Sequence, residues 1–209
     1  MIHAGTVAGK TERDVAESQR VQSMEQRSGD HDPERYFTQL MDDLPGLRIV
    51  HKSDDWFSKT LDGLLRVVTA GGQSAYTTRY VTTIGRTIYL PTRWSARTAE
   101  DRYVTLRHEA VHLRQFRRYS LVGMSLLYLL PVLPMGLAYG RARLEWEAYE
   151  ETLRATAEVW GIDAARSPEL RHRILDQFTG PAYGWMWPFR GSIARWIDEA
   201  LAEIERELP

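Results

Sequence analysis

The chain has 209 residues, 43% of them hydrophobic, which is enough for one domain with a buried core and short for two. Its net charge of −1 creates no overall field that would attract nucleic acid, so we expect no nucleic-acid partner. Because the chain has no cysteine, disulfides, thiolate metal sites and cysteine nucleophiles are excluded, and any metal site must use histidine and carboxylate ligands. The first 20 residues contain no apolar run typical of a secretory signal, so we expect a cytoplasmic location.

The first third of the chain predicts a flexible tail followed by the start of a single domain. Residues 1–31 are polar, charged and aperiodic, which is typical of a tail, and the domain is expected to span 32–209. It opens with a helix, because Asp32 suits the N-cap position and Pro33 the first helical position. The segment "LRIVH" then predicts a short strand, and a helix is expected from Ser53 to the glycine pair at 71–72.

The middle of the chain predicts a β-hairpin and a long helix. "YTTRYVTTIGRTIYLP" is rich in residues that favour strands, and Gly85-Arg86 separates its two runs. A helix is then expected from a capping start at Thr98 to about Arg118. Further helices are predicted over "RARLEWEAYEETLRATAEVW", near 169–178 and over 192–208, with an aromatic loop "YGWMWPF" before the last. These elements predict an α+β fold dominated by helix, with a small sheet or hairpin before the long helix.

The long helix carries the motif "HEAVH". His108 and His112 are four residues apart, so on a helix they lie one turn apart on the same face and can bind one ion together. Glu109 lies beside them, where its carboxylate can accept a proton from a water at the metal. Arg107, Arg114 and Arg118 share a stripe of this helix that we expect to be solvated, whereas Leu106 lies on a face that can pack.

A third ligand is predicted on the next helix. Glu145 and Glu147 are about 200° apart around a helix, so both cannot face one ion. Glu147 continues into a charged stripe, whereas Glu145 continues into a packing face that includes Ala148 and Thr152. A lone carboxylate on a packing face needs a partner, and a metal ion would be one, so Glu145 is the predicted ligand. The other interpretation of Glu145 is a surface residue paired with an arginine.

"HEAVH" followed by "EWEA", an E-x-x-A, resembles the gluzincin metallopeptidases, especially compact members. The resemblance covers about Tyr76 to Leu153. It implies a zincin-like domain, a Zn²⁺ ion held by His108, His112 and Glu145, and Glu109 as the group that activates water. Membrane-type gluzincins often have aspartate directly after E-x-x-A, where this chain has Tyr149.

The resulting hypothesis is a zinc metallopeptidase that hydrolyses peptide bonds in a protein or peptide substrate. We expect the strand near 87–90 to pair with the substrate, since it resembles the substrate-binding edge strand of gluzincins. Tyr149, one turn after Glu145, His172 and Tyr183 are the candidates for stabilising the oxyanion, and the sequence does not choose between them. The alternative is a catalytically inactive interaction protein that is stabilised by zinc or docks on a membrane.

An uncharged stretch from Leu121 to Tyr139 separates the two ligand-bearing helices. It is long enough to be considered as a membrane span, but one crossing would place His112 and Glu145 on opposite sides of the bilayer. We therefore expect an apolar hairpin over 120–140, either buried in the core or in peripheral contact with a membrane surface.

Overall fold

The computed structural model describes residues 31–52, 81–129, 139–180 and 186–208. The tail up to residue 30, the predicted helix at 53–72 and Tyr183 lie outside these ranges. The first described helix, α2, spans Pro33–Asp43, and the Asp32 side chain caps it by accepting a hydrogen bond of 3.0 Å from the backbone N–H of Glu34. Strand β1 follows at Arg48–His51, as predicted.

The predicted hairpin is confirmed as strands β2, Thr82–Ile84, and β3, Thr87–Leu90. Its two-residue loop needs a left-handed φ at the first position, and Gly85 supplies it with a φ of 61°. Strand β1 pairs in parallel with β3, so the sheet has the order β1-β3-β2.

This order contradicts the expectation that the strand at 87–90 pairs with a substrate. Strand β3 is central, with β1 on one side and β2 on the other, so its backbone hydrogen-bonding groups are already used by its two neighbours. The hairpin periodicity could not reveal this, because the parallel partner β1 lies more than thirty residues upstream.

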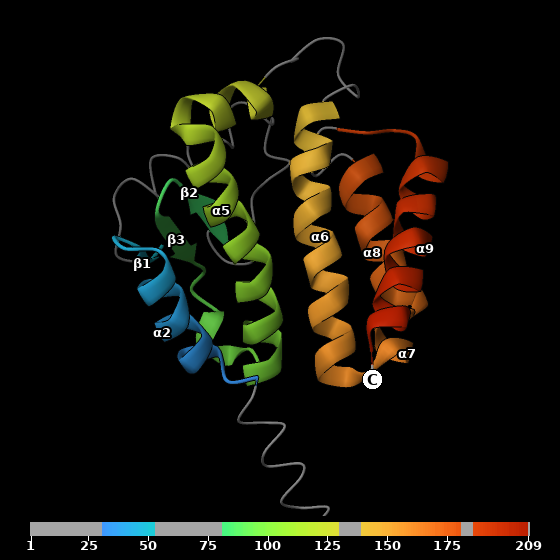
Figure 1. Ribbon diagram of the computed structural model, residues 1–209, viewed down its shortest axis with the longest axis horizontal. Coiled ribbons are helices and arrows are strands. Elements are labelled where there is room, and N and C mark those ends of the chain that lie inside the picture. Colours follow the sequence, from blue (N-terminus) through green and yellow to red (C-terminus); the bar gives the residue numbers. More distant parts are fainter. Residues whose placement is uncertain (1–30, 53–80, 130–138, 181–185, 209) are drawn as a thin grey trace, which may run out of the picture.

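Helix α5 spans Ala99–Leu129 but contains a break at Ser120, where φ is 61° and ψ is 171°. Its start is capped by the Thr98 hydroxyl, which accepts a hydrogen bond of 3.1 Å from the backbone N–H of Asp101. The regular part of the helix therefore ends close to the predicted Arg118, and residues 121–129 form a second helical piece with a different direction (Figure 1).

The remaining helices are α6 at Tyr139–Trp160, α7 at Ile162–Ala165, α8 at Pro168–Thr179 and α9 at Arg190–Glu207, with a 3-10 turn, η1, at Trp94–Ala96 before α5. Gly161 ends α6 with a φ of 89°. The short helix α7 was not predicted, since four residues are too few to show a helical period.

Helix α5 lies in the middle of the molecule (Figure 1). The sheet and α2 pack on one side, where Ile88, Leu90 and Trp94 contact Leu106 and Leu113 of α5. Helix α6 runs back along the other side of α5 and packs in turn on α7, α8 and α9 through the larger hydrophobic cluster. The fold is thus α+β and dominated by helices, with a small sheet before the long helix. In the described ranges, no helix is both long enough and apolar enough to cross a bilayer.

Candidate metal centre

The three predicted ligands come together between α5 and α6. One ligand atom from each of His108, His112 and Glu145 lies within 4.8 Å of the others, so the three side chains could hold a metal ion. His112 Nε2 is 3.9 Å from Glu145 Oε2, and the two imidazole rings are 5.0 Å apart between their centroids. Two histidines from one helix and one carboxylate from the next form a three-ligand set, which leaves room for a further ligand on the ion.

The packing face predicted for α6 explains how Glu145 reaches this place. Glu145 is buried, and Ala148, one turn further on, is fully buried against the neighbouring structure. A small side chain at 148 allows α6 to approach α5 closely, which brings the carboxylate to the histidines. Glu147 was expected on a solvated face, but it is half-buried and contacts α5 through Gln115. The helical phase of Glu145 was therefore right, while the charged stripe lies closer to α5 than predicted.

Thr152 fixes the proton on His108. Its hydroxyl donates a hydrogen bond of 3.0 Å to the backbone carbonyl of Ala148, which uses its only proton. The same oxygen is 3.0 Å from His108 Nδ1, and with its proton directed to the carbonyl it accepts from Nδ1–H. This tautomer leaves the lone pair on Nε2 available for a metal ion.

Gln115 fixes the proton on His112 in the same way. Its Nε2 donates to the backbone carbonyl of Leu144 and to Glu147 Oε2, each over 2.9 Å, and these two acceptors define which end of the amide is nitrogen. Its Oε1 is 2.9 Å from His112 Nδ1, so the ring donates from Nδ1. Both imidazoles are thereby held in the tautomer that metal binding through Nε2 requires, by residues from both helices.

Burial shifts the pKa values of His108 and Glu109 in the site. Burial lowers the pKa of His108 to about 3, and the neighbouring His112 acts in the same direction, so the His108 ring is neutral near physiological pH. Glu109 is buried, and burial raises its pKa. His112 and a hydrogen bond from Thr83 oppose this rise. The Thr83 hydroxyl, on strand β2, donates to Glu109 Oε2 over 2.6 Å and so orients the carboxylate.

Of the three oxyanion candidates, the structure places Tyr149 beside the site. Its ring is 5.0 Å from the His108 ring and 5.6 Å from Phe178, between centroids. His172 is elsewhere: it is exposed on α8, with Nε2 3.1 Å from Asp176 Oδ2. It is not among the residues that gather around the ligands.

Three residues that contact the site were not singled out from the sequence. Gln115 follows His112 by three residues, so helical spacing could have indicated it. Thr152 lies two turns after Glu145 and was read only as part of a packing face. Thr83 had no signal, because it reaches Glu109 through the packing of β2 on α5.

The arginine stripe of α5 is solvated only in part. Arg114 and Arg118 are exposed, as expected, but the Arg107 side chain is only 15% exposed. It forms ion pairs with Glu151 and Glu158, the latter at 2.7 Å. The expectation for Arg107 was wrong because α6 covers that part of α5, which the sequence of α5 alone does not show.

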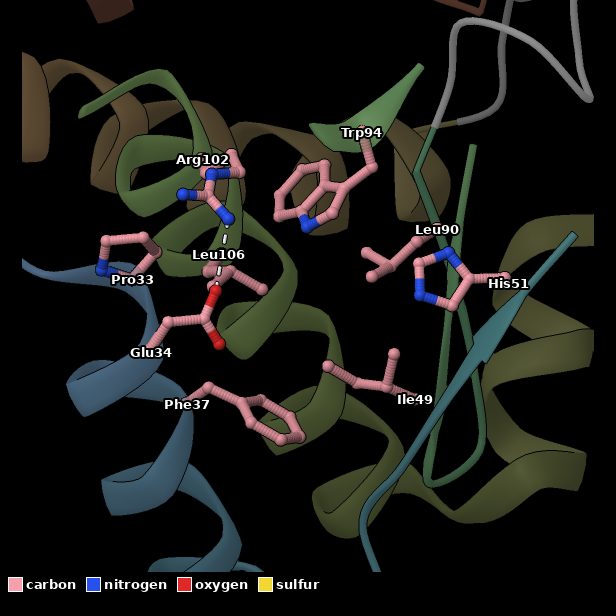
Figure 2. Close-up of a pocket in the computed structure, with 9 residues that line it drawn as sticks. All are labelled: Pro33, Glu34, Phe37, Ile49, His51, Leu90, Trp94, Arg102 and Leu106. Carbon is pink, nitrogen blue, oxygen red and sulfur yellow. Dashed lines mark hydrogen bonds and ion pairs between the residues drawn. The ribbon is translucent and has the colours of Figure 1, made fainter. Parts of the chain in front are cut away.

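A separate pocket of about 280 Å³ lies between α2, the sheet and the start of α5 (Figure 2). Its walls are mainly apolar, with Phe37, Ile49 and Leu90 facing one another, and an ion pair of 3.0 Å between Arg102 and Glu34 closes one side. None of the three ligands nor Glu109 lines it. The candidate metal centre is therefore separate from this pocket.

No protein-family model, curated protein or solved structure matches the chain. The donor set itself restricts the metal: two imidazoles and one carboxylate suit zinc and also copper, iron or nickel, whereas calcium and magnesium prefer oxygen ligands alone.

Proposed function

We propose that the protein is a zinc-dependent metallopeptidase with His108, His112 and Glu145 as metal ligands and Glu109 as the general base. The observation that carries the proposal is the matched pair of Nδ1 hydrogen bonds, from His108 to Thr152 and from His112 to Gln115. Metal-ligating histidines typically form a hydrogen bond through the ring nitrogen that does not bind the metal, because this bond fixes the tautomer and the ring orientation. Zinc is the metal of choice for such a set with an open position.

The proposed chemistry divides the work between the metal and the protein. Zinc supplies the Lewis acidity that makes water a nucleophile near neutral pH. Glu109 takes a proton from that water as its oxygen attacks the carbonyl carbon of the substrate. When the C–N bond breaks, Glu109 returns the proton to the leaving amine. Thr83 holds Oε2 of Glu109, so Oε1 is the oxygen that we assign to proton transfer.

Strand β2 is the segment that we assign to substrate docking. In the part of the chain that the structure describes, β3 is its only strand neighbour, so its outer edge has backbone groups for an extended peptide. Thr83 belongs to the same strand and contacts Glu109. A peptide bound along β2 would therefore run past the base. Tyr149, beside His108, is the proposed oxyanion donor.

The test is a comparison of the parent protein with Glu109→Gln, using metal analysis and a mixed-peptide cleavage assay. Both proteins should contain zinc, and the variant should lose cleavage by several orders of magnitude, since glutamine cannot accept the proton. Equal cleavage by the two would remove Glu109 from the mechanism. A parent protein that holds zinc but cleaves nothing would favour the inactive, zinc-stabilised interaction protein.

A further inference from the structure

Exposed hydrophobic side chains gather at one end of the molecule. Seven large hydrophobic residues are exposed in the described ranges, and five of them lie at the end where α5 finishes and where α6 and α9 begin (Figure 1). These five form the apolar end surface: Leu121 (56% exposed), Val122 (69%), Leu126 (52%), Tyr139 (53%) and Phe189 (50%). The other two, Met41 and Trp160, are isolated elsewhere, so the clustering needs an explanation.

The side chains of this end form a connected surface rather than scattered points. Gly140 approaches Leu127 so closely that an added Cβ would be 3.2 Å from Leu127 Cδ2, which places Tyr139 next to the second piece of α5. The Tyr139 ring is 5.3 Å from Trp187, and Trp187 is 5.0 Å from Phe189, between centroids. The contacts thus run from α5 through α6 to the start of α9.

The break at Ser120 gives the second piece of α5 its direction. The backbone of Ser120 has a positive φ, a conformation that residues other than glycine rarely adopt. The Ser120 hydroxyl accepts a hydrogen bond of 3.4 Å from the N–H of Gly123. Residues 121–129 therefore leave the axis of the histidine helix and run across the end of the helical layer (Figure 1). Met124 points inward and is buried, while Val122 and Leu126 are exposed on the outer side. An interfacial helix shows this orientation, with its apolar face outward.

Most of the charged residues next to the apolar end surface are arginines. The chain has five arginines and no acidic residue between Glu109 and Glu145. Arg117 and Arg118, just before the break, and Arg143, just after Tyr139, are exposed. Arg190, next to Phe189, is also exposed and pairs with Asp176 at 3.2 Å. Aromatic rings together with arginines at the edge of an apolar surface are typical of contact with the headgroup region of a bilayer.

We propose that the apolar end surface docks on an anionic lipid membrane, with residues 121–129 lying in the interface. The arginines beside this surface argue against a second copy of the chain as its binding partner. A symmetric dimer places one surface against itself, so the arginines of the two copies would face one another. An anionic bilayer instead attracts them and accepts the exposed leucine, valine and aromatic side chains. The proposal does not rest on the metal site or on any catalytic activity.

The test uses co-sedimentation of the full chain with vesicles of phosphatidylcholine, either pure or mixed with phosphatidylglycerol. We expect binding to the mixed vesicles, weaker binding to the pure ones, and loss of binding at high salt, which screens the arginines. The double variant Val122→Gln/Leu126→Gln should bind at least about tenfold more weakly, because two exposed apolar side chains no longer enter the interface. Arg117→Gln/Arg118→Gln should also weaken binding about tenfold or more.

Matched controls are available on the same chain. Met41→Gln/Trp160→Gln removes two other exposed apolar residues away from this end. Arg93→Gln/Arg206→Gln removes two exposed arginines, one just before η1 and one near the C-terminal end of α9. Both controls should bind vesicles as the parent does. Absence of binding to mixed vesicles, equal binding to pure phosphatidylcholine, or equal losses in the controls would overturn the proposal. So would a dimer in sedimentation velocity that Val122→Gln/Leu126→Gln converts to monomer, since that would assign the surface to self-association.

Discussion

Gln115 links His112 to Glu147: one end of its amide is 2.9 Å from the imidazole Nδ1 of His112 and the other is 2.9 Å from a carboxylate oxygen of Glu147. The residue that orients a candidate metal ligand on α5 is therefore held by α6. Because the backbone carbonyl of Leu144 holds the same amide nitrogen, Glu147 is one of two supports. This arrangement predicts a graded effect of substitutions on metal affinity.

Glu145→Ala should weaken zinc binding most, because it removes a ligand. Gln115→Leu should weaken it by about 10–100-fold, the usual cost of losing a partner that orients a ligand. Glu147→Ala should have only a few-fold effect, because Leu144 still holds the amide. Competitive chelator titrations of the three variants measure the order. An equal loss in Glu147→Ala and Glu145→Ala would show that the carboxylates have been assigned to the wrong roles.

Removing the metal should destabilise the parent protein but not the histidine variants. A ligand that binds only the folded state stabilises it by about 4 kcal/mol when its free concentration is about 1,000 times Kd. Addition of a chelator should therefore lower the Tm of the zinc-loaded parent. His108→Ala and His112→Ala should lack stoichiometric zinc and show no shift, while His172→Ala, which changes an exposed histidine, should behave as the parent. Full zinc content in His108→Ala would exclude the proposed centre.

Thr83→Val should separate catalysis from metal binding. The substitution keeps the shape of the side chain and removes the hydroxyl that donates a hydrogen bond to Glu109. This bond is stronger than one between neutral groups, because Glu109 is charged when it acts as a base. We expect kcat to fall about tenfold or more while zinc affinity stays within about twofold, because Thr83 contacts the base and not a ligand. Thr87→Val, in the neighbouring strand, is the control. A parallel fall in zinc affinity would mean that Thr83 supports the centre as a whole.

Arg107→Met should destabilise the packing of α5 on α6. The guanidinium is mostly buried and pairs with Glu151 and Glu158, so its loss leaves two poorly solvated carboxylates without their cation. We expect a loss of roughly 2–4 kcal/mol in the free energy of unfolding, measured by urea denaturation. Arg171→Met breaks a more exposed ion pair with Asp198 and should cost at most about 1 kcal/mol. Equal losses in the two variants would contradict the special role of Arg107.

The sequence by itself determined the local elements and indicated which side chains could share one metal ion. The spacing of His108 and His112 places them on one helical face, and the neighbours of Glu145 identify it as the inward carboxylate. Gly85 likewise determines the hairpin, because its loop needs a left-handed φ. These features depend on backbone geometry within a few residues, and that geometry is readable from residue types and their spacing.

The tertiary structure decided which surfaces are covered. Arg107 is buried because α6 lies over it, Thr83 reaches Glu109 because β2 packs on α5, and β3 is central because β1, from an earlier part of the chain, pairs with its second edge. The break at Ser120 also depends on its surroundings, since serine on its own does not favour that backbone conformation. Each of these facts depends on contacts between segments far apart in the chain, and helical or strand periodicity describes only the segment that contains it.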